Sequence, residues 1–346
     1  MRYTSDMSRS MRLTLFLISA ATLTFEIVLT RIFSVAQFYH FAFMIVSIAL
    51  LGFGASGTAL MIFPKFGRND PRQKLSLFGL GTGFSILSAY LLTNHLPFDS
   101  FSIAWDRRQV GILVLHYLAL ATPFFFSGMA IGLLLDAYPE SAGGTYAVNL
   151  FGSALGCVIA LLAPTLLGAE GTVALASGLA ALGALVCLFS GGRFSRSREA
   201  ATLLLLILVC FDLGLRLVRE SGLSIMEIRL SPYKGLSYAM QYPKAELVYS
   251  RWNAFSRVDV MDSEGIHSIP GLSYRYLEPL PHQDGLFADG DDLSTILPEG
   301  ADLNFSNFLP LALPFELRPE ARALILEPRG GLDILAALAL GAEKVI

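Results

Sequence analysis

Charged residues are scarce in this chain of 346 residues. Asp, Glu, Lys and Arg together make up 15% of the sequence, whereas hydrophobic residues make up 54% and the mean hydropathy is +0.58. This balance is unusual for a soluble protein and predicts a membrane protein. The net charge of -3 at pH 7 offers no basic surface to a phosphate backbone. A nucleic-acid partner is therefore not expected.

Cysteine is also scarce, and the chain lacks familiar catalytic and metal-binding patterns. Cys157, Cys187 and Cys210 lie in apolar runs without CxxC spacing, so neither a disulfide framework nor a thiolate metal site is expected. His267 and His282 lie in loops with no third ligand beside them in the sequence, and no metal site is predicted. No Ser/His/Asp or Cys/His arrangement is recognisable, so catalytic residues stay unassigned.

Long apolar runs, by contrast, are abundant. An α-helix needs roughly 20 apolar residues to cross a bilayer, and the stretches that reach this length predict about seven helices in a transmembrane bundle over residues 1–218. The apolar stretches are 13–35, 41–63, 75–94, 110–135, 146–167, 171–190 and 200–218. Small residues recur at four-residue spacing, as in Gly152-Ser-Ala-Leu-Gly156, which is typical of close helix packing in lipid. The first stretch has no cleavage pattern after it and is interpreted as a retained helix.

The distribution of Lys and Arg predicts a cytoplasmic N-terminus, because short basic loops stay on the cytoplasmic side. The outer loops then carry only Arg107 and Arg108. The inner flanks carry Arg2, Arg9, Arg12, Lys65, Arg68, Arg72, Lys74, Arg193, Arg196 and Arg198. The prediction is a multi-pass protein of the cell membrane. Seven crossings would place residues after 218 outside the cytoplasm, whereas a re-entrant last segment would not, and both topologies stay open.

Shorter mixed runs separated by Pro and Gly follow residue 218. Residues 219–300 are predicted to form a small β-hairpin-rich segment. The run "AELVYSRWNAFSRVDVMDSEG" is typical of two strands that end in a turn at 263–265. The run "ADGDD" at 288–292 predicts an Asp-Gly hairpin turn, since the twelve-residue spacing of a calcium-binding EF-hand loop is absent.

Residues 301–346 are predicted to start a Rossmann-like α/β domain that is incomplete. After a Pro-punctuated connection over 301–322, an apolar run at 323–327 predicts a buried parallel strand. A glycine turn follows, then an amphipathic helix that ends at Gly341, and then the start of another strand. One helix face is expected to hold Leu332, Leu335, Leu338 and Ala339. Such a unit gathers backbone N–H groups at the helix start, which suits a phosphate or a carboxylate.

The chain as a whole resembles the membrane-bound spermidine-synthase-like proteins, in which a multi-helix membrane module is fused to an aminopropyltransferase/methyltransferase-type Rossmann domain. The resemblance covers most of the chain. The stretches that carry it are "FEIVLTRIFS" with "ALLGFGASG", "YAVNLFGSALGCVIALLAPTLLGAEGT", and the succession "SPYKGLSYAM…VYSRWNAFSRVDV…GLFADGDDLSTI…ALILEPRGGLDILAALALGAEKVI".

The resemblance implies transfer of an aminopropyl or methyl group from decarboxylated or ordinary S-adenosylmethionine to a polyamine or another small acceptor. Glu327, Gly330, Gly331 and Asp333 would hold this donor, and the "SPYK" stretch with Lys234 would lie near it. The acid that binds the ribose and the catalytic Asp of the family would both follow Ile346. The sequence is therefore interpreted as a fragment that ends inside its Rossmann-like domain.

Ionisable residues inside a membrane are costly and are functional candidates by default. The ionisable residues Glu26, Arg31, His116 and Asp212, and the polar Asn149, fall in the apolar stretches. Each is interpreted first as a group that packs between helices or hydrogen-bonds to another helix, with a substrate or proton site as the alternative. Two other functions accordingly stay open beside the transferase: a membrane transporter, and a scaffold protein with a degenerate, non-catalytic α/β domain.

Overall fold

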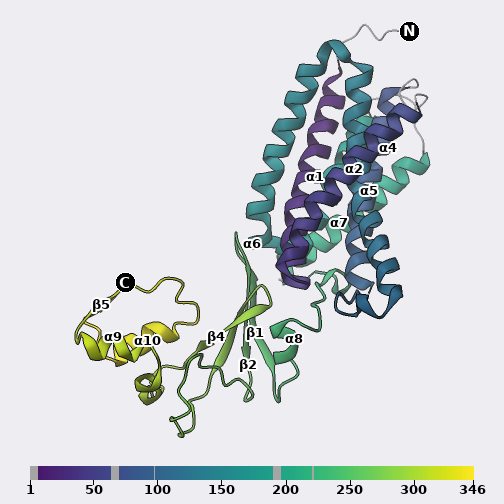
Figure 1. Ribbon diagram of the computed structural model, residues 1–346. Coiled ribbons are helices and arrows are strands. Elements are labelled where there is room, and N and C mark those ends of the chain that lie inside the picture. Colours follow the sequence, from purple (N-terminus) through teal and green to yellow (C-terminus); the bar gives the residue numbers. More distant parts are fainter. Residues whose placement is uncertain (1–6, 64–69, 97, 190–195, 220–221) are drawn as a thin grey trace. The chain divides into compact units, whose positions relative to one another are not determined.

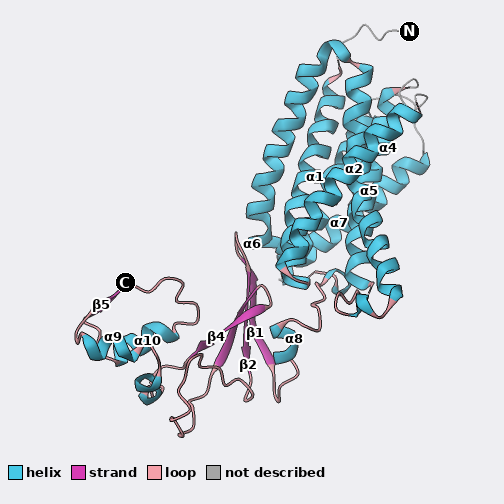
Figure 2. Cartoon of the chain, viewed as in Figure 1, coloured by secondary structure: helices cyan, strands magenta, loops and turns pink. Residues whose placement is uncertain are grey.

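The computed structural model describes residues 7–63, 70–96, 98–189, 196–219 and 222–346. The chain divides into two compact units, Met1–Arg229 and Leu230–Ile346. The first unit is helical, and the strands belong to the second (Figure 2). Residues 222–229 follow the last apolar stretch of the sequence, but they belong to the first, helical unit.

Long helices form the first unit (Figure 1). They are α1 Arg9–Ala36, α2 Tyr39–Ile62, α4 Pro71–His95, α5 Arg107–Ala137, α6 Ala142–Phe189 and α7 Arg196–Arg219. Side-chain caps start several of them: Asp70 accepts from the Arg72 N–H and Asp106 from the Arg108 N–H. Among the described residues, these six helices are long and apolar enough to cross a membrane. The predicted set of long apolar helices is confirmed, and their length and composition are compatible with a membrane protein.

Helix α6 contains two helical arms rather than one rod. Gly168 breaks the helical backbone with φ 71 and ψ 168. Gly152 and Gly183 lie about 30 residues apart, which is about 46 Å along one straight helix. Both nevertheless contact the same part of α1: a Cβ on Gly152 would lie 2.4 Å from the Phe16 carbonyl oxygen, and Thr14 donates to the Gly183 carbonyl at 2.8 Å. The arms 142–167 and 169–189 therefore double back at Gly168.

With the two arms counted separately, the described residues of the bundle form seven long helical segments that alternate in direction. Tyr138 at the end of α5 donates to Met11 Sδ at the start of α1, and Leu75 near the start of α4 packs in the same cluster. Arg198 at the start of α7 donates to the Gln73 carbonyl of α4. These contacts lie at the N-terminal end of the bundle. At the opposite end, which we call the exit end, Arg216 near the end of α7 reaches the Leu167 carbonyl at the α6 break.

Small residues let the helices approach closely, as the four-residue spacing predicts. A Cβ on Gly156 would lie 2.5 Å from the Ala20 carbonyl oxygen, and one on Gly83 would lie 2.8 Å from that of Ser177. Helices α1, α4 and α5 enclose a core around Leu15, Phe78 and Leu133. The outward faces expose large apolar side chains on most helices, which suits contact with lipid. Examples are Leu50, Phe84, Leu166, Leu204 and Phe211.

The second unit is built on a four-stranded antiparallel sheet in the order β1-β2-β3-β4. Its strands are β1 Glu246–Trp252, β2 Arg257–Asp262, β3 Asp284–Ala288 and β4 Asp291–Ile296. The strands and the turn predicted over 245–265 are confirmed. Asp289 and Gly290 join β3 to β4 with φ values of 51 and 72, as a two-residue hairpin turn requires, so the predicted Asp-Gly turn is also confirmed.

The end of the chain forms a parallel strand-helix-strand unit, although not a Rossmann domain by itself. Strand β5 Arg322–Ala323 pairs in parallel with β6 Lys344–Val345, and α10 Leu332–Ala339 connects them. Before it, α8 Gly235–Ala239 and α9 Ala312–Leu317 are short helices. Helix α9, with a 3-10 turn at Asn304–Phe308, occupies the stretch expected to be a connection.

Two details of this unit differ from the sequence prediction. The strand at 323–327 is shorter than expected and not buried: Leu324 and Leu326 are 69% and 79% exposed. Within the described residues β6 alone pairs with β5, and this short sheet gives those side chains little to pack against. The helix face is also rotated, because Leu332 and Ala336 enter the core with Phe305, whereas Leu338 and Ala339 are exposed. Leu332 and Ala336 are four residues apart, so they lie on the same side of the helix, and this side faces the core.

Candidate functional sites

The glycine turn before α10 has an unusual backbone. Glu327, Arg329 and Gly331 have φ values of 54, 45 and 85. Positive φ is common for glycine but uncommon for other residues, and it concentrates at turns and binding sites. Gly331 is the N-cap of α10 in the left-handed conformation. The turn therefore reverses the chain sharply at the point where the helix begins.

Gly330 has no space for a side chain. Its N–H donates to Ser294 Oγ at 3.1 Å, and a Cβ built on it would lie 2.2 Å from the Thr295 carbonyl oxygen. Both partners belong to β4. The glycine turn therefore packs directly against strand β4 of the four-stranded sheet, and only glycine at position 330 allows this close approach.

The structure places the other predicted donor-binding residues around this turn. Glu327 and Asp333 are exposed, and Gly331 is half-buried. Asp333 lies in the first turn of α10, where a carboxylate is stabilised by the positive end of the helix. The four residues therefore come together at one helix start, as the sequence predicts from their closeness along the chain.

The "SPYK" stretch, which ends at Lys234, also contacts strand β4. Lys234 is buried, and its Nζ lies 3.2 Å from Asp291 Oδ2 and donates to the Asp289 carbonyl at 3.0 Å. The Gly235 N–H donates to Asp291 Oδ1 at 2.9 Å. Two segments that sequence analysis singles out, nearly a hundred residues apart, are therefore both attached to β4. We call Lys234, Asp291, Ser294, Arg329 and Gly330 the β4 platform.

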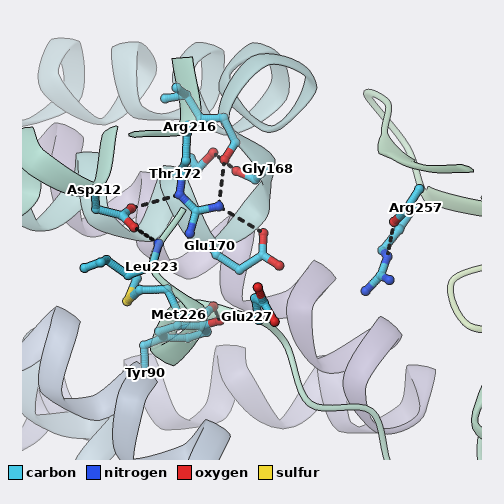
Figure 3. A network of polar contacts seen from close by, with 12 residues as sticks. Tyr90, Gly168, Glu170, Thr172, Asp212, Arg216, Leu223, Met226, Glu227 and Arg257 are labelled. Atoms are coloured by element: carbon cyan, nitrogen blue, oxygen red, sulfur yellow. Dashed lines mark hydrogen bonds and ion pairs between the residues drawn. The ribbon is translucent and has the colours of Figure 1, made fainter. Parts of the chain in front are cut away.

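A second polar site lies at the exit end of the bundle (Figure 3). Arg216 Nε donates to Asp212 Oδ2 at 2.8 Å, and Arg216 Nη1 lies 4.0 Å from Glu170 Oε2. The exposed fractions of the Arg216, Asp212 and Glu170 side chains are 9%, 4% and 13%. A buried charge is tolerated only when it is paired and hydrogen-bonded, and these three groups meet that condition together.

Two glycines make room for the Arg216 side chain. A Cβ on Gly171 would lie 2.6 Å from Arg216 Cδ, and one on Gly222 would lie 2.4 Å from Arg216 Cζ and Nη2. Nη2 is buried and has no hydrogen-bond partner in the described residues. The guanidinium is thus enclosed between the α6 break and the segment that follows α7.

The same site anchors the segment that follows α7. The Leu223 N–H donates to Asp212 Oδ1 at 2.8 Å, and the Tyr90 hydroxyl donates to the Met226 carbonyl at 2.5 Å. Asn94 donates to the Glu227 carbonyl at 2.7 Å. Sequence analysis singles out Asp212 alone among these residues. Glu170 and Tyr90 gave no sequence signal, because their partners lie on other helices or beyond a turn. Arg216 was missed although its i, i+4 spacing to Asp212 could have indicated the pair.

Asn149 and Arg31 follow the packing interpretation, because each bonds to a residue on another helix. Asn149 Oδ1 accepts from Ser19 Oγ at 2.8 Å, and Arg31 Nη1 donates to the Ala160 carbonyl at 3.4 Å. His116 is buried against the Phe98 ring, with centroids 5.6 Å apart. These groups join α1 to α6 and the 98–101 loop to α5. Comparison with protein-family models, curated proteins and solved structures finds no match to this chain.

Proposed function

We propose that this membrane protein is a transferase of the spermidine-synthase-like or methyltransferase-like kind. In this proposal it moves an aminopropyl or methyl group from decarboxylated or ordinary S-adenosylmethionine to a polyamine or another small acceptor. The observation that carries the proposal is the β4 platform, where a glycine turn that opens a helix and the Lys234 segment share one strand. The family resemblance suggests the chemistry, and the β4 platform supports the proposal because the predicted donor-binding residues lie together there.

In this proposal the donor lies against the turn formed by Glu327, Gly330, Gly331 and Asp333. The start of α10 offers N–H groups and a positive helix end to an acidic group of the donor. The Glu327 and Asp333 carboxylates are exposed and available to hydroxyl, amino or sulfonium groups. Arg329 Nη2 lies 3.9 Å from Asp292 Oδ2, which directs this cation toward β4. The bilayer is the partner of the helical unit.

Isothermal titration of the detergent-solubilised chain with each donor tests this proposal. We expect saturable heat with at least one donor, and at least fivefold weaker binding for Glu327→Gln and Asp333→Asn, because each removes a carboxylate beside the proposed donor. Glu299→Gln is the matched control, since Glu299 is an exposed acid of the same unit outside the turn. Absence of heat at millimolar donor, or equal affinity in all variants, would refute donor binding at this turn.

A second candidate function is that of a membrane transporter, or of a scaffold whose α/β unit is not catalytic. Two observations together favour this second candidate: the seven helical segments that alternate in direction, and the distribution of Lys and Arg. Basic residues flank the N-terminal end, including Arg9, Arg12 and Arg72, and predict that this end is cytoplasmic. Residues 222–229 then leave the bundle on the other side, away from the cytosolic pool of S-adenosylmethionine. Membrane orientation therefore separates the two candidates.

A further inference from the structure

The end of the antiparallel sheet brings two carboxylates face to face. Asp262 is the last residue of β2, Asp284 is the first residue of β3, and the two are direct partners in the antiparallel register. Like charges placed opposite each other on neighbouring strands destabilise a sheet. Because the register holds these backbones opposite, this position favours a cation between the two side chains.

A histidine joins this pair from the same strand edge. His282 Nε2 lies 3.0 Å from Asp262 Oδ1 and 3.5 Å from Asp284 Oδ1. Gln283 separates the two ligands along the chain; it is buried, and its Oε1 accepts from the Ser268 N–H at 2.8 Å. In extended chain, residues two apart point to the same face. The buried Gln283 thus fixes the backbone while His282 and Asp284 converge on Asp262.

The ligand atoms of these three residues lie close enough together to share one metal ion. One ligand atom from each residue lies within 4.8 Å of the other two. For metal–ligand bonds of about 2.1 Å, neighbouring ligands lie about 3.0 Å apart in an octahedron and about 3.4 Å apart in a tetrahedron. The two separations from His282, 3.0 and 3.5 Å, are close to these values, and the two carboxylate oxygens lie within 4.8 Å of each other.

The donor set also indicates which ions suit the site. An imidazole nitrogen favours zinc and other first-row transition ions, whereas Mg²⁺ and Ca²⁺ favour oxygen ligands alone. The side chains of His282, Asp262 and Asp284 are 53%, 50% and 40% exposed, so water has access to the remaining coordination positions. Three protein ligands with an open position are characteristic of exchangeable or catalytic zinc rather than of closed structural sites.

We infer that Asp262, His282 and Asp284 bind one divalent transition-metal ion of the zinc class at this end of the sheet. This inference is independent of the proposed transferase activity, since none of the three residues belongs to the β4 platform. Sequence spacing gave no indication of the site, because Asp262 and His282 are separated by a long loop and meet only through strand pairing.

Zinc titration of the full chain tests the inference. The detergent-solubilised protein is stripped with a chelator, transferred to chelator-free buffer and titrated with ZnCl₂ by calorimetry. We expect one zinc ion per chain, and at least tenfold weaker binding for His282→Ala and Asp284→Asn. Excess MgCl₂ should not displace the zinc from the wild-type chain, because the nitrogen ligand discriminates against magnesium.

His267→Ala is the matched control, since His267 is an exposed histidine in the loop between the same two strands. Its zinc affinity should equal that of the wild type. The Asn variant preserves side-chain shape and removes one of two opposed charges, so it is expected to fold without metal. Zinc binding that is absent at millimolar ZnCl₂, or unchanged in both ligand variants, would overturn the inference and leave His282 as an ion-pair partner of the two acids.

Discussion

Arg216 illustrates how a single charge is accommodated in an apolar bundle. Its guanidinium reaches Asp212 on its own helix and Glu170 beside the α6 break, and glycines on both sides leave room for it. Asp212 in turn accepts the Leu223 N–H. A charge buried in this way contributes to structure only while its partners remain, because an unpaired ion in a low-dielectric site carries a large desolvation penalty.

Removal of one partner should therefore cost more than removal of both. We expect Arg216→Met to destabilise the chain by about 3 kcal/mol, because it leaves Asp212 and Glu170 buried without their cation. The double variant Arg216→Met with Asp212→Leu should be less destabilised than the single one. Thermal unfolding in detergent measures both, with Arg108→Met, an exposed cation at the same end, as the control. Equal stability of the single variant and this control would contradict a structural role for the pair.

The separation of partners along the chain explains which site residues the sequence could predict. Glu327, Gly330, Gly331 and Asp333 lie within one turn, so their proximity follows from the sequence itself. Arg216 with Glu170 and His282 with Asp262 come together through tertiary packing or strand register. Sequence spacing carries no information on such pairs unless the topology is already known.

At the scale of elements, long apolar runs determine the helices and small residues determine how closely they pack. The membrane-spanning runs were predictable because a bilayer sets their length. The exposure of the strand at 323–327 was not predictable, since burial depends on what covers a strand rather than on the strand's own residues. Gly156 on α6 shows the packing effect, as its backbone lies against the Ala20 carbonyl of α1 and Thr24 donates to the Gly156 carbonyl at 3.2 Å.

A methyl group at Gly156 should separate α1 from α6. We expect Gly156→Ala to destabilise the bundle by about 1 to 3 kcal/mol through overpacking. Gly144 on the same helix is the matched control, because a Cβ there meets nothing within 4 Å. Gly144→Ala should be neutral or stabilising by up to about 1 kcal/mol, from helix propensity alone. The two unfolding temperatures in detergent give the comparison, and a Gly156→Ala variant as stable as Gly144→Ala would show that the helices tolerate the added volume.

At the scale of the whole molecule, the break at Gly168 decides the topology. If α6 were one crossing, the chain would cross six times and both ends of the helical unit would face the same side. The two arms instead contact the same stretch of α1, which gives seven segments and places residues 222–229 at the end opposite Arg9. If all seven segments cross a membrane, we expect residues 222–229 to emerge on the side opposite the N-terminus, whereas a re-entrant last segment would keep both on the same side.

A topology reporter decides whether the chain after Arg229 lies on the cytoplasmic side of the membrane or on the opposite side. Alkaline phosphatase, active outside the cytoplasm, and green fluorescent protein, fluorescent inside it, are fused in separate strains after Arg229, at the boundary of the two units. From the Lys and Arg distribution and seven crossings, we expect phosphatase activity and no fluorescence. The same reporters joined at Phe63, after two crossings, are the control and should give the opposite pattern. Fluorescence after Arg229 would instead place the β4 platform beside the cytosolic donor pool and favour the transferase over the transporter or scaffold.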